Sequence, residues 1–309
     1  MGNIKDKNMY KRNLSIILGI AVLAFAALAC SVNVNLPRVE TSETVTLEIN
    51  EPAPSGEARV AISMGAGDLE ITGGSRQMVE GTIRTNVEML KPVLNRDGSK
   101  VEITQKGEWK GLPPSKFINE WKLKLGGAPT DLVINAGAYR GSLDLGGIPL
   151  SRLEIADGAS SVKVIFSTPN SGKMSLLLYR TGASTVELLN LGNANFEEMI
   201  FEGGAGTNTL DFSGALRQKG TVRISGGVSS NKIIIPEGTP AEIRITGAIT
   251  DIATVGTWKV VDKTYRVEGS GPGLVITVDM SLGRLELIQK EAEIQPADSG
   301  GGFLEGTPG

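Results

Sequence analysis

The sequence Gly-Ala-Ser-Thr-Val-Glu-Leu at residues 182–188 is one copy of a motif that recurs along the middle of the chain. Each copy opens with glycine and a small residue and continues into an alternating apolar segment. A fixed period of roughly 20–50 residues indicates stacked structural units. The copies begin 21, 24, 22 and 22 residues apart, a mean of about 22, at Gly137, Gly158, Gly182, Gly204 and Gly226.

A second series of short apolar segments lies between these copies. Alternation with a period of two places one face of a strand inward and the other in water. We therefore predict two short strands in each unit, separated by glycine-rich turns in which glycine supplies a positive φ. The series comprises Leu153-Glu154-Ile155, Leu177-Leu178-Tyr179, Met199-Ile200-Phe201, Val222-Arg223-Ile224 and Ile243-Arg244-Ile245.

This repeat predicts an all-β fold, a single-stranded parallel β-helix (β-solenoid) with coils of about 22 residues. Each coil of such a fold buries its apolar face only when its neighbours stack on it. Gly247-Ala248 is expected to begin a further coil after the five copies. Residues 137–294 are assigned to the solenoid and 58–136 to a looser β section, as is usual for the terminal part of a solenoid.

The composition of the 309 residues narrows the classes of function. The chain has no histidine and one cysteine, whereas serine and cysteine nucleophiles usually need a histidine base and zinc sites are built mostly from His and Cys. The formal net charge of −3 offers no basic surface for nucleic acid. We therefore expect no enzyme, no cofactor, no metal site and no nucleic-acid partner.

The first 30 residues have the pattern of an export signal. A basic segment with Lys5, Lys7 and Arg12 precedes an apolar run over residues 14–29, which is short for a membrane span. The run ends in Ala27-Leu28-Ala29-Cys30, which resembles the lipobox of bacterial lipoproteins. The resemblance implies that residues 1–29 are a signal peptide and that Cys30 is lipidated, so that the membrane is a partner. The alternative is an uncleaved membrane anchor. Either alternative places the remainder outside the cytoplasm.

Two further segments differ from the repeat. Residues 30–57 are rich in Pro, Ser and Thr and are assigned to a lipid anchor and tether, with a first strand expected where residues 44–49 alternate. Residues 295–309 contain a Gly300-Gly301-Gly302 run and are assigned to a disordered tail.

The segment 106–122 interrupts the β pattern with two tryptophans, a Pro-Pro pair and several lysines. One hypothesis is a binding loop for glycan or a lipid headgroup. The other is a structural excursion that covers an end of the solenoid. Trp121 alternates with Leu123 and Leu125, which predicts that Trp121 belongs to the core.

Carboxylates recur at outward positions of the repeat. Stacked coils place equivalent residues about 4.8 Å apart, so a carboxylate cluster of the kind used by β-helix polysaccharide-active enzymes is one hypothesis. A lysine interrupts the row, and alternating charges are also typical of a solvated strand face, so we predict no catalytic residues. The outward positions are Glu70, Asp144, Lys163, Glu187 and Asp211.

The segment Gly65-Ala66-Gly67-Asp68-Leu69-Glu70-Ile71, followed by residues 79–82, is similar to the opening of the bacterial toastrack families. Later segments follow the same order, and the resemblance covers roughly residues 58–290. It implies a β-solenoid and a cell-envelope protein, since relatives are described as adhesin-like or as regulators of the envelope stress response. We thus expect a lipid-anchored, non-enzymatic surface protein with an adhesion, scaffold or binding role, and an unidentified protein or glycan partner. A polysaccharide-active enzyme and an envelope-stress sensor are the alternatives.

Overall fold

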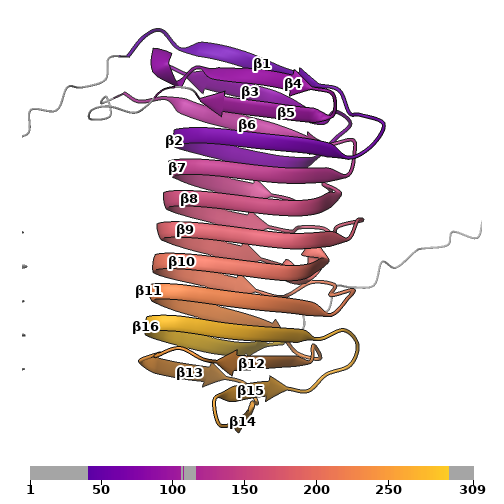
Figure 1. Ribbon diagram of the computed structural model, residues 1–309, viewed down its shortest axis with the longest axis vertical. Helices are drawn as coiled ribbons and strands as arrows, with labels where there is room; N and C mark the ends of the chain where they lie inside the picture. Colours follow the sequence, from indigo (N-terminus) through magenta and orange to yellow (C-terminus); the bar gives the residue numbers. More distant parts are fainter. Residues whose placement is uncertain (1–40, 106, 108–115, 292–309) are drawn as a thin grey trace, which may run out of the picture. The chain divides into compact units, whose positions relative to one another are not determined.

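The computed structural model describes residues 41–105, 107 and 116–291. Long, sharply bent strands stacked one on another form the centre of this part of the chain (Figure 1). Each is 15 to 18 residues long, and they lie in the order β2 (Ala58–Ser75), β7 (Thr130–Asp144), β8 (Leu150–Ile165), β9 (Met174–Leu189), β10 (Phe196–Asp211), β11 (Gly220–Pro236) and β16 (Leu274–Lys290).

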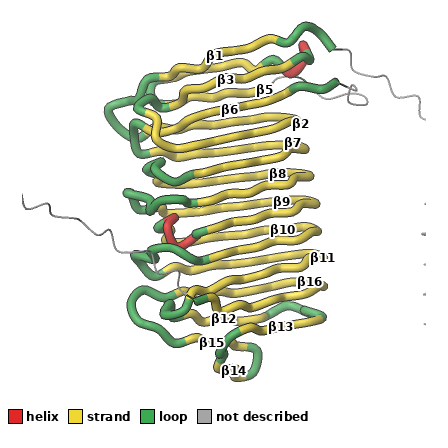
Figure 2. Tube along the Cα trace, turned by 180° about the vertical axis from the view of Figure 1, so that it is seen from behind, coloured by secondary structure: helices red, strands yellow, loops and turns green. Residues whose placement is uncertain are grey.

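Each neighbouring pair of these long strands is parallel and in register over most of its length. The predicted β-solenoid is therefore confirmed. Figure 2 shows the loops between successive long strands from β7 to β11 gathered on one side of the stack, away from the bends. No helix in the described ranges is long and apolar enough to span a bilayer.

The two short strands predicted for each unit are continuous in the structure. Strand β8, for example, runs from Leu150 to Ile165 through Gly158, where it bends. The stack is thus one sheet folded at the bends, and we call its two halves the first-half sheet, before the bends, and the second-half sheet, after them. Apolar side chains of both sheets point into the space between them and form the core.

The reason for the glycines at the bends differs from the prediction. The glycines that open each copy do not have a positive φ, so the prediction is wrong for them, although Gly67 and Gly206, two residues further along the bend, do have one. Instead, the glycines of successive coils form a column in which a Cβ would lie 2.3–2.9 Å from the carbonyl oxygen of the glycine on the preceding coil. Glycine is required because the backbones approach too closely for a side chain. The column comprises Gly65, Gly137, Gly158, Gly182, Gly204 and Gly227, so the fifth repeat aligns through Gly227 and not Gly226.

The N-terminal end of the stack is covered by shorter strands. Strands β6 (Asn119–Gly126), β3 (Val79–Thr85) and β1 (Val45–Glu51) extend the second-half sheet beyond β2. Strand β1 lies where residues 44–49 predict it. Strands β5 (Lys100–Gln105) and β4 (Pro92–Asp97) extend the first-half sheet. A short 3-10 helix, η1 (Glu88–Leu90), precedes β4.

The C-terminal end has a different order from the sequential one expected. The last long strand, β16, lies between β11 and the segment that begins with Gly247-Ala248. Strand β12 (Ala241–Ile245), just before Gly247, pairs with β16 on the first-half sheet, and β13 (Asp251–Val255), just after Ala248, pairs with it on the second. Strands β15 (Thr264–Val267) and β14 (Lys259–Val261) continue outward from β12. A second 3-10 helix, η2 (Leu191–Ala194), joins β9 to β10.

Candidate functional site

Cys30, the predicted lipidation site, lies outside the described residues. Much of the 106–122 excursion, including Trp109, also lies outside them. The described remainder confirms that Trp121 belongs to the core, because its side chain is fully buried and its indole Nε1 donates a hydrogen bond of 3.0 Å to Asn119 Oδ1. Whether the excursion binds a ligand stays a prediction.

The outward carboxylates do not form one row. Glu70, Lys163 and Glu187 occupy one column of the second-half sheet, together with Ser142 between the first two. Asp144 and Asp211 lie in the next column, where Ile165 and Leu189 of the intervening coils separate them. The hypothesis of a stacked carboxylate cluster is therefore wrong for these two residues.

Asp144 and Asp211 have local structural roles. Asp144 Oδ1 accepts hydrogen bonds from the backbone N–H of Gly146 at 3.0 Å and of Ser167 at 3.3 Å. Asp211 Oδ1 accepts one from the N–H of Ser213 at 2.8 Å. Both carboxylates thus hold the start of the loop that follows their strand, as aspartate commonly does in turns.

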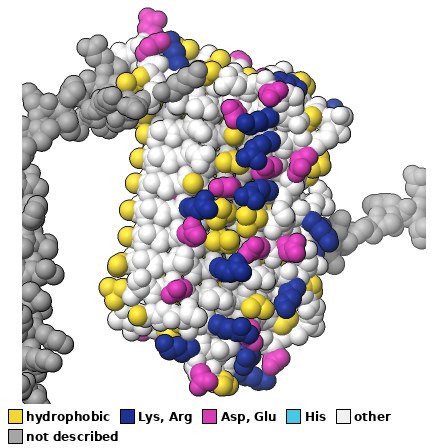
Figure 3. Space-filling model, viewed as in Figure 1, with side chains coloured by type: hydrophobic (Ala, Val, Ile, Leu, Met, Phe, Trp, Pro, Cys, Tyr) yellow, Lys and Arg dark blue, Asp and Glu magenta, His cyan; other side chains and the backbone are white. Residues whose placement is uncertain are grey.

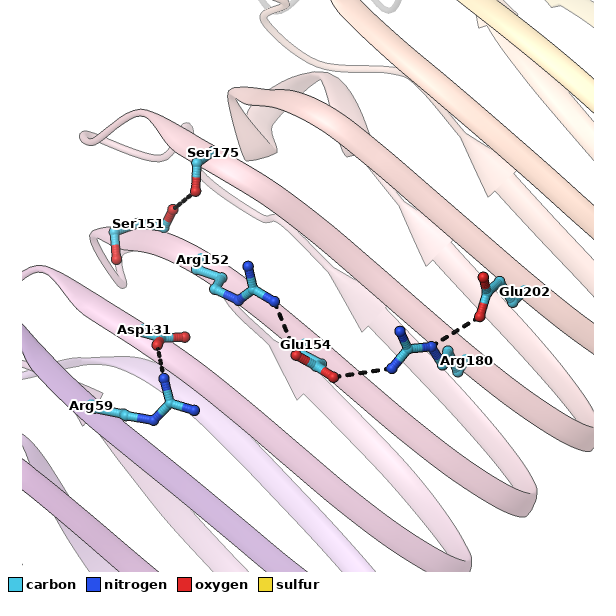
Figure 4. Close-up of polar contacts among 8 residues, drawn as sticks. All are labelled: Arg59, Asp131, Ser151, Arg152, Glu154, Ser175, Arg180 and Glu202. Atoms are coloured by element: carbon cyan, nitrogen blue, oxygen red, sulfur yellow. Dashed lines mark hydrogen bonds and ion pairs between the residues drawn. The ribbon is translucent and has the colours of Figure 1, made fainter.

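The first-half sheet carries a continuous line of ion pairs across three coils (Figure 4). Arg180 on β9 donates from Nη1 to Glu154 of β8 at 3.2 Å and from Nε to Glu202 of β10 at 2.9 Å. Arg152 on β8 lies 3.2 Å from the other oxygen of Glu154. Arg59 and Asp131 form a separate pair closer to the N-terminal end. The arrangement follows from parallel strands in register, which place residues 22 to 26 apart in sequence side by side.

Apolar side chains lie within this charged face, and Figure 3 shows them enclosed by Lys, Arg, Asp and Glu at mid-height. They are Leu176 and Leu178 on β9 and Ile200 on β10, all at outward positions. Leu178 is largely covered by its neighbours, with 4% of its surface exposed, whereas Leu176 and Ile200 are partly exposed. A further ion pair, between Arg223 and Glu198, borders them on the side of β11. We call these three residues with the surrounding charges the central face.

Sequence reasoning did not single out the central face. A signal was present, since Leu176-Leu177-Leu178-Tyr179 and Met199-Ile200-Phe201 are continuous apolar runs in two adjacent coils, whereas the neighbouring coils alternate as Leu153-Glu154-Ile155 and Val222-Arg223-Ile224. Similar runs occur farther along the stack, at residues 132–134 of β7 and 274–276 of β16. Such a run indicates a strand with apolar residues on both faces. In this stack, one of those faces points to solvent.

An open groove of about 820 Å³ lies near the N-terminal end, over β1, β3, β6 and β2. Its walls carry Lys122 and Lys124 on β6 and Glu48 on β1, and Gly81 of β3 lies between them. Lys122 is 3.7 Å from Glu70, and both side chains are more than half exposed. Charges of both signs line the groove, and nothing in its geometry selects one ligand.

A polar network lies inside the stack near the bends. Asp157 accepts a hydrogen bond of 2.7 Å from the Tyr179 hydroxyl on Oδ2, and Oδ1 accepts from the hydroxyls of Thr181 and Ser184. The Tyr139 hydroxyl is buried nearby and has no partner of good hydrogen-bond geometry. Burial, followed by the Asp157 charge, raises the pKa of Tyr139. The pKa of Tyr179 is raised by burial and by the proximity of Tyr139 and Asp157.

Within the described residues, no group of three or more Cys, Asp or Glu side chains has a metal-binding arrangement. The central face therefore remains the feature with a distinct chemistry on the outside of the stack.

Residues 36–188 match the N-terminal domain of toast_rack. The chain belongs to the toastrack family. This match includes β1 through most of β9, so the toastrack domain contains the N-terminal cap and the first half of the central face. No protein of curated function matches the sequence.

Three solved structures are similar to this toastrack protein. A candidate cell adhesion protein from Clostridium sporogenes has 16% identity and a TM-score of 0.47, with 80% of this chain and 99% of that chain covered. A candidate adhesin from Bacteroides fragilis has 9% identity and a TM-score of 0.40, covering 81% and 99%. A candidate adhesin from Parabacteroides merdae has 12% identity and a TM-score of 0.34, covering 81% and 98%.

Proposed function

We propose that this toastrack protein is a non-enzymatic, lipid-anchored protein of the bacterial cell envelope that presents its β-solenoid for adhesion or binding. The observation that carries the proposal is the position of Cys30. It is the only cysteine of the chain and follows the apolar run and Ala27-Leu28-Ala29 directly. The β structure begins shortly after it, with β1 at Val45.

The chemistry of lipidation agrees with this role. Two or more acyl chains on one cysteine, at about 0.8 kcal/mol per buried methylene, hold a protein stably on a membrane. The residues between Cys30 and β1 then act as a tether, and the protein is located outside the cytoplasm, on the cell surface or in the periplasm.

The arrangement of the carboxylates supports the non-enzymatic part of the proposal. Glycoside hydrolysis needs two carboxyl groups about 5–10 Å apart that face the same bond. Asp144 and Asp211 are separated by two coils with apolar side chains, and each holds its own loop. Arg180 and Glu154 are engaged in ion pairs with each other.

The lipid anchor is tested by expressing the wild type, Cys30→Ala and Ser31→Ala in a bacterium and measuring detergent partitioning and intact mass. We expect the wild type and Ser31→Ala to enter the detergent phase with the mass of residues 30–309 plus acyl chains. Cys30→Ala is expected to lose the acyl mass. If Cys30→Ala entered the detergent phase as fully as the wild type, and no variant carried acyl mass, the apolar run would be the anchor.

The non-enzymatic part is tested separately with pectate, alginate, chitin and peptidoglycan as substrates. We expect no turnover of any of the four. Turnover that is lost in Asp144→Asn or Glu187→Gln would contradict the proposal.

A further inference from the structure

The central face has a two-fold self-complementary pattern. Its outward residues form a grid of four strands, β8 to β11, and three positions along each strand. On β9 and β10 the middle positions are Leu178 and Ile200, and the positions nearest the bends are Arg180 and Glu202. The middle positions of β8 and β11 are Glu154 and Arg223.

A two-fold axis that runs along the strand direction, midway between β9 and β10, exchanges β9 with β10 and β8 with β11. When a second copy is placed face to face about this axis, Leu178 lies opposite Ile200 of the second copy. Arg180 lies opposite Glu202, and Glu154 lies opposite Arg223. By symmetry each of these three contacts occurs twice. Two of the resulting six opposed pairs are apolar, and four are of opposite charge.

The two apolar residues in the middle of the face differ in exposure. Leu178 is covered by its neighbours, while Ile200 beside it is partly exposed. Ile200 of each copy therefore supplies most of the apolar contact at the centre of the pairing.

Two kinds of opposed pair, each also occurring twice, are not complementary, since Leu176 lies opposite Glu198 and Arg152 lies opposite Thr221. The first of them involves the carboxylate of Glu198. That carboxylate is already bound to Arg223 of its own chain, which reduces the cost of the mismatch.

We propose that the central face binds a second copy of this chain, in an antiparallel, face-to-face dimer. Because the axis runs along the strands, it reverses the direction of the stack. The β1 ends of the two copies, where the chain enters each stack, then lie at opposite ends of the dimer. This geometry suits copies that extend from two facing membranes. The dimer itself does not depend on the proposed envelope role, whereas adhesion between two membranes does.

The size of the face predicts a weak dimer. Four strands about 4.8 Å apart and three outward positions about 6.7 Å apart cover on the order of 400 Å² per copy. A stable interface buries about 800 Å² per partner. Individual contacts are thus transient, and strong adhesion comes from many copies acting together.

The test is sedimentation of the full-length protein in a non-ionic detergent at increasing concentration, with the variants Arg180→Glu, Glu202→Arg and the double variant that carries both. Each single variant opposes like charges twice in the dimer and should weaken association by at least ~10-fold. The double variant restores opposite charges and should restore association. Ile200→Ala, which keeps every charge, should also weaken it.

Thermal unfolding of each variant verifies that the fold is retained. A wild type that stays monomeric up to roughly 1 mM, the weak end of specific association, would overturn the proposal. Association that is unchanged in both single variants and in Ile200→Ala would overturn it as well. None of these outcomes depends on lipid at Cys30, so the dimer and the lipid anchor can fail independently.

Discussion

A Cβ atom on Gly182 would lie 2.4 Å from the carbonyl oxygen of Gly158 on the preceding coil. That oxygen belongs to backbone that is itself held between two coils, so it cannot move aside easily. The bend of each coil is therefore fixed by contact with the next bend, and this column of contacts sets how closely the coils stack.

Gly182→Ala should lower the free energy of unfolding by about 2–3 kcal/mol, because the added methyl overlaps backbone in a close-packed position. Urea unfolding followed by circular dichroism measures it. Ala183→Ser is the matched control, since Ala183 is exposed at the next position and the change should stay within about 0.5 kcal/mol. Equal effects of the two substitutions would contradict the close approach of the coils.

The two buried tyrosines should differ in their response to loss of the hydroxyl. Tyr179→Phe removes the donor to Asp157 Oδ2 and leaves a carboxylate oxygen less satisfied, which should cost about 1–3 kcal/mol. Tyr139→Phe removes a hydroxyl that has no well-placed partner and should be neutral or slightly stabilising. The comparison is made by chemical unfolding near pH 7. A larger loss of stability for Tyr139→Phe than for Tyr179→Phe would contradict the hydrogen bond from Tyr179 to Asp157 as the stabilising contact of the network.

Stability should fall at alkaline pH through the same tyrosines. Both folded-state pKa values are raised, so the folded protein keeps its phenols neutral while the unfolded chain ionises them near the ordinary pKa of 10.0. Their contribution is complete below that pH and declines above it, by up to about 1.4 kcal/mol per pH unit for each tyrosine. The wild type should therefore lose more stability between pH 10 and 11.5, roughly, than the variant with both tyrosines changed to Phe. Parallel pH profiles for the two proteins would argue against the raised pKa values.

The line of ion pairs on the first-half sheet should contribute little to folding. Arg180 has half of its side chain exposed, and exposed pairs are typically worth about 0–1 kcal/mol each. Arg180→Ala should thus change the free energy of unfolding by less than about 1 kcal/mol, with the loss smaller in high salt. A loss of several kcal/mol in thermal unfolding would mean that the ion pairs hold the coils together, and would weaken their assignment to a binding face.

Much of the fold could be predicted from the sequence because its core is periodic. The 22-residue period and the alternation around Gly137 to Gly204 indicated the β-solenoid, and residues 44–49 indicated β1. The role of the bend glycines could not be predicted, since a glycine required for close approach and a glycine required for a positive φ look the same in sequence. The position of β16 between β11 and β12 could not be predicted either, because pairing between strands far apart in the chain leaves no local signal.

The candidate site was less accessible to sequence reasoning. The hypothesis of a carboxylate cluster rested on the residue type of Asp144 and Asp211, but the register of the strands decides which side chains are neighbours. The same register brings Ile200 of one coil beside Leu178 and Arg180 of the preceding coil. Residues 20 or more apart in sequence cannot be recognised as neighbours until the coils are aligned. Apolar runs in two adjacent coils were a local sign of an apolar outer face, but similar runs at residues 132–134 and 274–276 kept it from being distinctive.

The central claim, that lipid-anchored copies join through the central face, is tested most directly with vesicles that carry the full-length lipidated protein. Light scattering follows their aggregation. Wild-type vesicles should aggregate, whereas vesicles with only Arg180→Glu or only Glu202→Arg should not. A mixture of the two variant populations should aggregate, because the negative charge introduced at position 180 of one copy then opposes the positive charge introduced at position 202 of the other. Failure of wild-type vesicles to aggregate, or a mixture no better than its separate components, would contradict the account.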